Sequence, residues 1–88
     1  MEIEFDPAKD ELNRAKHGIS LARAADLEEL TIEADDRFPY GEARYRAWGL
    51  IDGRLYCMAF VKRGQLVRPI SLRRAHEKEV RRHVPKNY

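Results

Sequence analysis

The dipeptide Asp52-Gly53 separates two apolar-rich runs, Ala43 to Ile51 and Arg54 to Lys62. A type I′ turn needs positive φ at both central positions, so this pattern predicts a two-residue β-hairpin. Residues whose numbers sum to 105 then lie opposite each other. One face carries Arg44, Arg46, Trp48 and Leu50 against Val61, Ala59, Cys57 and Leu55, and the other carries Tyr45 and Ala47 against Phe60 and Met58. Because both faces are largely apolar, we expect the hairpin to be covered on both sides.

The part of the chain before the hairpin has helical signals. Asp6-Pro7 is a favourable helix start and Gly18 a favourable stop, which predicts a helix from Pro7 to His17 with Ala8, Leu12 and Ala15 on its apolar face. Ser20 is positioned to cap a second helix, Leu21 to Leu30. Alternating residues predict short strands at Glu2 to Phe5 and at Thr31 to Ala34.

After the hairpin, Leu66 to Leu72 is a third strand-like run. Pro69 cannot donate to a strand ladder, so we expect this strand at a sheet edge or at a bulge. Simple alternation places Arg68 on the side of Leu66, Ile70 and Leu72. Ser71 is a candidate cap for a last helix, Arg73 to about Val84, whose thin apolar stripe suggests a covering partner or neighbouring subunit. The sequence therefore predicts a single α+β domain over residues 1–88, with an N-terminal helix pair, an antiparallel meander and a C-terminal helix.

Charge is divided unevenly along the chain. Residues 1–42 hold 5 Lys and Arg against 12 Asp and Glu, and residues 43–88 hold 12 against 3, so formal charges of −7 and +9 lie behind a net +2. Of the 17 basic residues 12 are Arg, whose planar fork suits phosphate and carboxylate groups. We therefore expect an anionic partner, either nucleic acid or an acidic protein.

Other classes of function find no support in the sequence. A chain of 88 residues has no room for a separate cofactor domain, and no motif for acyl transfer, ATP hydrolysis or hydride transfer is present. The single Cys57 cannot form an internal disulfide, and His76 and His83 are seven residues apart, which does not fit a metal pair. We expect a cytoplasmic protein without cofactor, metal, export signal or membrane segment.

Arginines before, within and after the third strand are the main candidates for chemistry. They include Arg63, Arg68, Arg73 and Arg74, and we expect them to converge with Arg44 and Arg46 on one phosphate-binding surface. Arg81 and Arg82 are instead interpreted as solvating the last helix, with Glu77 and Arg81 as an ion pair four residues apart.

Two further positions bear titratable groups. His17 ends the first helix, where the helix dipole favours the protonated ring; this predicts a raised pKa suited to a general acid, or else a simple capping role. Lys16 precedes it. Glu42 is the acid that introduces the basic half, with a role as a base, in orienting an arginine or in simply starting a surface strand.

Taken in order, several blocks of the sequence resemble the BrnT family of bacterial toxins. They are FDPAK at 5–9, Asn13, KHGIS at 16–20, GEARYRAWG at 41–49, DGRL at 52–55 and RPISLRRA at 68–75. The resemblance implies a RelE-like ribonuclease fold, inhibition of translation through RNA cleavage, and an antitoxin, BrnA, that neutralises the toxin and joins it in a DNA-binding complex. It also implies a dimer or a heterotetramer with the antitoxin, and contact with operator DNA only through that complex.

Matched position by position, the resemblance implies roles for eight residues. His17, Arg44, Arg68 and Arg73 are the candidate catalytic residues, and Lys16, Glu42, Arg63 and Arg74 the candidate RNA-binding residues. Cleavage would use the substrate's own 2′-OH and no metal. Two alternatives have the same charge distribution without cleavage: a module that docks nucleic acid or an acidic protein, and an inactive family member that acts as a co-repressor.

Overall fold

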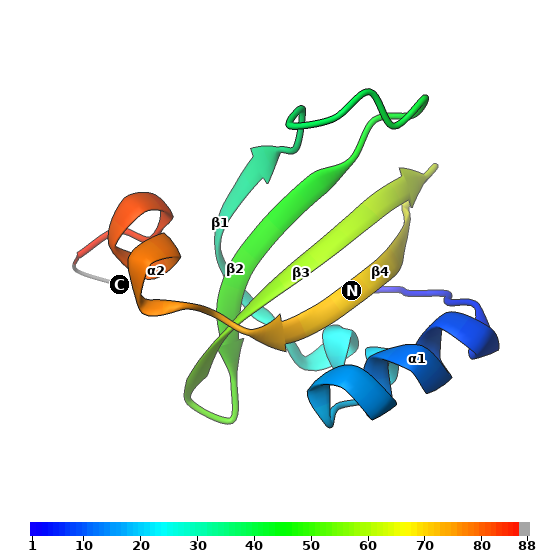
Figure 1. The fold of residues 1–88 in the computed structure, drawn as a ribbon, viewed down its shortest axis with the longest axis horizontal. Helices are drawn as coiled ribbons and strands as arrows, with labels where there is room; N and C mark the ends of the chain where they lie inside the picture. Colours follow the sequence, from blue (N-terminus) through cyan, green and yellow to red (C-terminus); the bar gives the residue numbers. More distant parts are fainter. Residues whose placement is uncertain (87–88) are drawn as a thin grey trace.

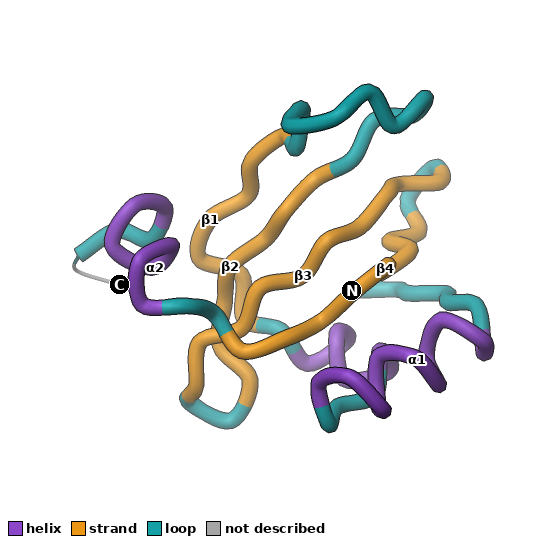
Figure 2. Tube along the Cα trace, viewed as in Figure 1, coloured by secondary structure: helices purple, strands orange, loops and turns teal. Residues whose placement is uncertain are grey.

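The computed structural model describes residues 1–86. Its elements, in order, are α1 (Pro7–His17), the 3₁₀ helix η1 (Leu21–Asp26), β1 (Glu28–Ala34), β2 (Tyr45–Ile51), β3 (Arg54–Arg63), β4 (Leu66–Arg74) and α2 (Glu77–His83). The four strands form one antiparallel sheet in the order β1-β2-β3-β4, the predicted meander, and the fold is α+β (Figure 1). The long connection between β1 and β2 extends beyond the sheet (Figure 2). No helix among residues 1–86 is long and apolar enough to cross a membrane.

The central hairpin has the predicted register. Tyr45 pairs with Phe60, Trp48 with Cys57 and Leu50 with Leu55, and the turn residues Asp52 and Gly53 have φ of 51° and 76°. Local turn geometry therefore sets which side chains share a face along the whole of β2 and β3.

Both faces of the hairpin are covered, as the sequence predicted. The main core lies on one face, where η1 packs on the sheet; its buried members are Leu21, Ala24, Leu27, Ala47, Ile51, Met58, Phe60 and Leu72. The smaller core on the other face joins Trp48 and Cys57 to Val84, which follows α2. The two helical ends of the chain therefore lie on different sides of the sheet.

Helix α1 has the predicted bounds but not the predicted buried face. The Asp6 carboxylate accepts from the Ala8 N–H at 2.9 Å, and Gly18 ends the helix with φ of 73°. Ala8, Leu12 and Ala15 are exposed, Leu12 by 69 %, and Asn13 is the buried residue of the helix. The predicted apolar face was wrong because α1 docks on β4 and η1 through polar side chains that satisfy backbone groups.

The second predicted helix was wrong in its second half. Only Leu21–Asp26 is helical, as a 3₁₀ turn, with Ser20 capping it through the Ala22 N–H at 3.1 Å. From Glu28 the chain runs as β1 and pairs with β2, so the strand expected at Thr31 to Ala34 is present and longer. Pairing with a strand distant in sequence outweighs the local helical pattern here.

Pro69 was expected either at a sheet edge or at a bulge. Strand β4, which contains Pro69, is the last strand in the sheet order and also carries a bulge. Ala59 pairs with Ser71 and Phe60 pairs with Pro69, so Ile70 is the extra residue. The bulge reverses the predicted sidedness: Leu72 joins the main core, whereas Arg68 pairs with Val61 on the opposite face. The strand expected at Glu2 to Phe5 is reduced to a parallel bridge between Ile3 and Val67.

The last helix is shorter than predicted. Arg73 and Arg74 belong to β4, paired with Cys57 and Tyr56, and α2 begins only at Glu77 after the cap residue His76. Ser71 is therefore a strand residue and not a cap. The helix ends before Pro85, as expected.

Candidate functional site

One face of the sheet carries arginines from three segments. We call Arg44, Arg46, Arg68 and Arg73 the arginine face. Arg46 and Trp48 are two positions apart on β2, so their side chains lie on the same face. Arg44, just before the strand, continues this spacing. Arg68 and Arg73 are five positions apart, so a regular strand would put them on opposite faces. The bulge at Ile70 brings them to the same one, opposite Val61 and Cys57.

Carboxylates already hold two of these side chains. Arg68 Nη1 lies 3.2 Å from Glu4 Oε1. Arg73 donates from Nη1 to Glu79 Oε1 at 2.6 Å and from Nη2 to Glu79 Oε2 at 3.1 Å. The hydrogen bond to Glu79 raises the pKa of Arg73. Burial by itself would raise the pKa of the Glu79 carboxyl, but the hydrogen bond from Arg73 lowers it, and the net pKa is lowered. These carboxylates mark where an anion binds each fork.

The other two arginines lie on aromatic rings. The Arg44 guanidinium carbon is 4.1 Å from the centroid of the Tyr40 ring, and that of Arg46 is 4.9 Å from the Trp48 centroid. Within residues 1–86, the buried Nε atoms of both arginines have no hydrogen-bond acceptor. A buried donor without an acceptor is costly, so these two side chains favour an incoming anion.

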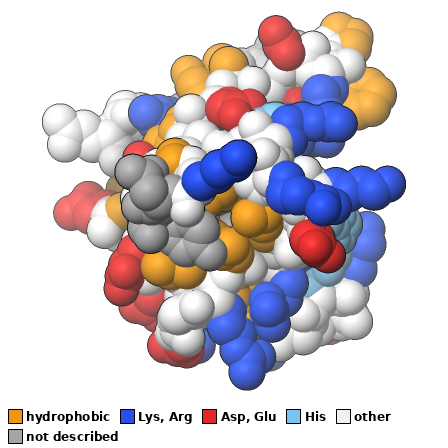
Figure 3. Space-filling model, turned by 90° about the vertical axis from the view of Figure 1, so that its left-hand side faces the viewer, with side chains coloured by type: hydrophobic (Ala, Val, Ile, Leu, Met, Phe, Trp, Pro, Cys, Tyr) orange, Lys and Arg blue, Asp and Glu red, His pale blue; other side chains and the backbone are white. Residues whose placement is uncertain are grey.

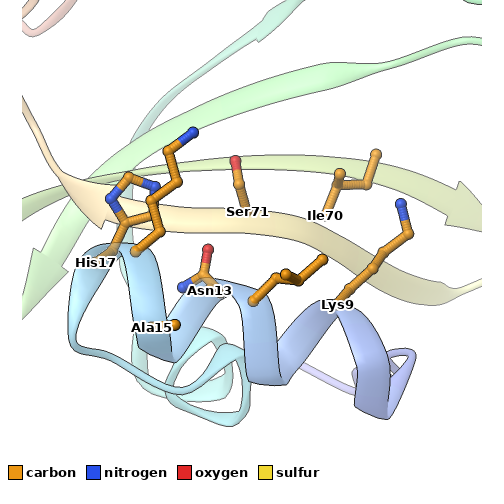
Figure 4. A pocket seen from close by; sticks show the side chains of 8 residues that line it. Lys9, Asn13, Ala15, His17, Ile70 and Ser71 are labelled. Atoms are coloured by element: carbon orange, nitrogen blue, oxygen red, sulfur yellow. The ribbon is translucent and has the colours of Figure 1, made fainter.

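Lys16 and His17 lie at the edge of this face. A hollow of about 590 Å³ between α1 and β4 is lined by both residues together with Ser71, Ile70 and Asn13. Figure 4 shows the His17 ring at the end of α1, close below the strand that carries Ser71. The cap and helix dipole predicted a raised pKa, and this was wrong: burial, then the positive charges of Lys16 and Arg73, lower the pKa of His17. The ring is therefore neutral at pH 7.

The remaining candidates lie on the opposite face or at the margins of this group. Arg74 is on the opposite face, with its guanidinium carbon 5.7 Å from the centroid of the Tyr56 ring. Glu42 is exposed in the connection between β1 and β2. Arg63 is exposed at the far end of β3, on the side of the arginine face by strand alternation.

Several polar contacts beside the site were not predicted. Asp35 is buried and accepts from Arg37 Nε at 2.7 Å, which lowers the pKa of Asp35 to about 2. His83 stacks on Trp48 with ring centroids 4.4 Å apart and bonds to Glu33 at 2.7 Å. Glu33 and Trp48 are distant in sequence from His83, so no local pattern indicates those contacts, whereas Asp35 and Arg37 are only two residues apart.

Side chains for metal binding are not grouped in the described part of the chain. Residues 1–86 contain no cluster of three or more His, Cys, Asp or Glu arranged to hold a metal ion. Cys57 is buried, and burial raises the pKa of its thiol to about 11.

Fold and site together define a small α+β protein with an arginine-rich sheet face. The family described as "Ribonuclease toxin, BrnT, of type II toxin-antitoxin system" matches residues 5–79, and the chain belongs to this family. Among solved structures, the chain is similar to the Brucella abortus ribonuclease toxin BrnT at 28% sequence identity, with a TM-score of 0.65. That match covers 88% of this chain and 99% of the Brucella chain. A comparison with curated proteins finds no match.

Proposed function

We propose that this chain is a RelE-like endoribonuclease toxin, a single domain over residues 1–88, that inhibits translation by cleaving RNA without a metal ion. Membership of a ribonuclease toxin family supports the class. The single observation that carries the mechanism is that the β4 bulge puts Arg68 and Arg73 on the face of Arg44.

In the proposed reaction the 2′-oxygen of a ribose attacks the adjacent phosphorus. A bond forms between O2′ and phosphorus, the bond from phosphorus to O5′ breaks, and the products are a 2′,3′-cyclic phosphate and a 5′-hydroxyl. The proton leaves O2′ and one proton is returned to O5′. Negative charge grows on the non-bridging phosphate oxygens, where guanidinium groups stabilise it.

Arg44, Arg68 and Arg73 hold the scissile phosphate in this proposal, and Arg63 binds a flanking one. His17, neutral at pH 7, accepts the O2′ proton, which replaces the general-acid role predicted from the helix dipole. Lys16 supports the local positive field. Arg74 receives no role because it lies on the opposite face, and Glu42, which lines a hollow together with Arg44, stays a candidate for orienting that arginine.

Arg68 and Arg73 must each exchange a carboxylate for phosphate. Glu79 occupies both Nη atoms of Arg73, so RNA binding there requires Glu79 to release at least part of the fork. A dianionic transition state competes for the fork better than a monoanionic ground state does, which is the direction that favours catalysis.

We also propose a BrnA-type antitoxin as partner, in a heterotetramer that covers the arginine face and contacts operator DNA through the antitoxin, in the cytoplasm. The positive charge of that face is the feature that supports an acidic antitoxin surface.

Expression in bacteria without an antitoxin tests the function. Wild-type protein is expected to arrest growth, and Arg68→Ala is expected to relieve the arrest. Arg54→Ala, which changes an exposed arginine at the hairpin turn, is the matched control and should arrest growth like the wild type. Normal growth with soluble wild-type protein would overturn the toxin assignment.

Purified protein tests the chemistry. RNA incubated with translating ribosomes should yield fragments ending in 2′,3′-cyclic phosphate. Free RNA without ribosomes should be cleaved at the same rate in excess EDTA as in magnesium. Intact RNA would favour the binding module or co-repressor over the enzyme.

A further inference from the structure

A second cationic hollow lies between α2 and the arginine face. It measures about 660 Å³, and its positive lining residues are Arg37, Arg46, Lys78, Arg81 and Arg82. Glu77 and Glu79 also line it. The side of the molecule that bears α2 is shown in Figure 3, where Lys and Arg side chains gather toward the right of the view and acidic ones toward its left edge.

Most of the positive charge in this hollow is not neutralised within residues 1–86. Arg37 is paired with Asp35 at 2.7 Å, and Glu79 is engaged by Arg73. Arg46, Arg81 and Arg82 have no carboxylate within 4.0 Å in the described chain, and the expected pair between Glu77 and Arg81 does not form. The interpretation of Arg81 and Arg82 as parts of a paired, solvated helix surface was therefore wrong about the pairing.

Arg46 joins this hollow to the arginine face. It follows Arg44 on the same side of β2, and its buried Nε has no acceptor among residues 1–86. The Arg46 guanidinium lies over the ring of Trp48, which is fully buried, and the ring of His83 stacks on Trp48 as well. Glu33 holds His83 in turn at 2.7 Å.

We propose that this hollow is an RNA subsite that binds a second phosphodiester, next to the one on the arginine face, through Arg46, Arg81 and Arg82. We take the ligand to be a single strand, whose flexible backbone can pass from Arg46 on β2 to Arg81 and Arg82 on α2. This subsite rests on the proposed function for its substrate, but its test measures binding and not cleavage.

The probe is a fluorescein-labelled 2′-O-methyl RNA 12-mer, which has no free 2′-OH and is not cleaved. Its affinity is measured by anisotropy over a series of salt concentrations for the wild type and Arg81→Ala/Arg82→Ala. Two lost phosphate contacts should make the slope of log K against log salt shallower by about 1.4, with binding about tenfold weaker at moderate salt. Both residues are exposed, so the fold should be retained.

Arg54→Ala/Lys62→Ala is the matched control. It removes the same charge from exposed positions of β3 outside the hollow. Its salt slope should change by less than half as much, and Arg81→Lys/Arg82→Lys should restore most of the slope. Equal effects of the two alanine pairs would overturn the subsite.

A poly-glutamate 12-mer separates RNA from an acidic protein segment. If Arg81→Ala/Arg82→Ala weakens binding of this peptide and leaves RNA binding unchanged, the subsite assignment to RNA is overturned. If the wild type neither arrests growth nor cleaves RNA, yet the probe binds with the predicted slope change, the proposed function fails and the subsite stands.

Discussion

The Asn13 side chain ties α1 to the sheet at the strand that carries Arg68 and Arg73. Its amide nitrogen donates to the Leu72 and Ile19 carbonyl oxygens, both at 2.9 Å, and its Oδ1 accepts from the Leu72 N–H at 3.0 Å. Asn13 is 5 % exposed. Replacing it with Ala leaves these three backbone groups without their partner, two of them in fully buried bonds.

The expected loss follows from these contacts. Each buried backbone group left unpaired costs about 1–3 kcal/mol, and Ala regains about 0.5 kcal/mol through its higher helix propensity. At about 2 kcal/mol for each of the two fully buried groups, Asn13→Ala should therefore lower the free energy of unfolding by about 3.5 kcal/mol. The total is roughly 4–13 kcal/mol for a domain of this size, and the corresponding fall in Tm is about 15–30 °C.

Urea denaturation followed by the fluorescence of Trp48, the single tryptophan, measures this loss. Glu11→Ala, exposed on the same helix, is the control and should stay within about 0.5 kcal/mol of the wild type. If Asn13→Ala unfolds at the same urea concentration as this control, then the three hydrogen bonds do not anchor α1, and the reasoning is refuted.

Three other predictions concern buried groups. The pKa of Asp35 is lowered from 3.8 to about 2, so its stabilising effect is present above pH 3.8 and lost as the pH falls toward 2. Asp35→Asn should therefore lower the free energy of unfolding at pH 7 and weaken its dependence on pH between 3.8 and 2. The buried Cys57 thiol, with its pKa raised to about 11, should react with a thiol reagent at pH 8 only after unfolding, and rapid labelling of folded protein would contradict its burial. A Cβ on Gly49 would collide with the Glu28 carbonyl oxygen, so Gly49→Ala should cost about 1–3 kcal/mol in thermal unfolding; an unchanged Tm would show that β1 shifts freely.

Which arginines share a surface shows how far the sequence reaches toward the site. The hairpin register placed Arg44 and Arg46 on one face from two turn residues alone, and the structure has the same register for Arg46. The placement of Arg68 failed because strand alternation was counted through Ile70, the bulge residue. Proline signals that a ladder is interrupted, but it does not specify which neighbour is left unpaired.

The predicted direction of the pKa shift of His17 was wrong for a related reason. A helix C-terminus favours a protonated ring, and that local effect is visible in the sequence. Burial, then the positive charges of the adjacent Lys16 and of Arg73, act in the opposite direction and dominate; burial and the approach of Arg73 come from the packing of α1 beside β4. The sequence located the residue, whereas the environment that sets its protonation is tertiary.

By itself, the sequence determined the features that depend on neighbouring residues, namely the caps of α1 and the turn and register of β2 and β3. It also determined the uneven charge and the family resemblance, which are properties of the whole sequence. The tertiary structure decided that Glu28–Ala34 is a strand, that Arg73 belongs to β4, and that α1 docks through Asn13. The division has a physical cause. Caps and tight turns are fixed by contacts within a few residues, but pairing a strand or satisfying a buried backbone group depends on partners far along the chain, such as Leu72 for Asn13, 59 positions away.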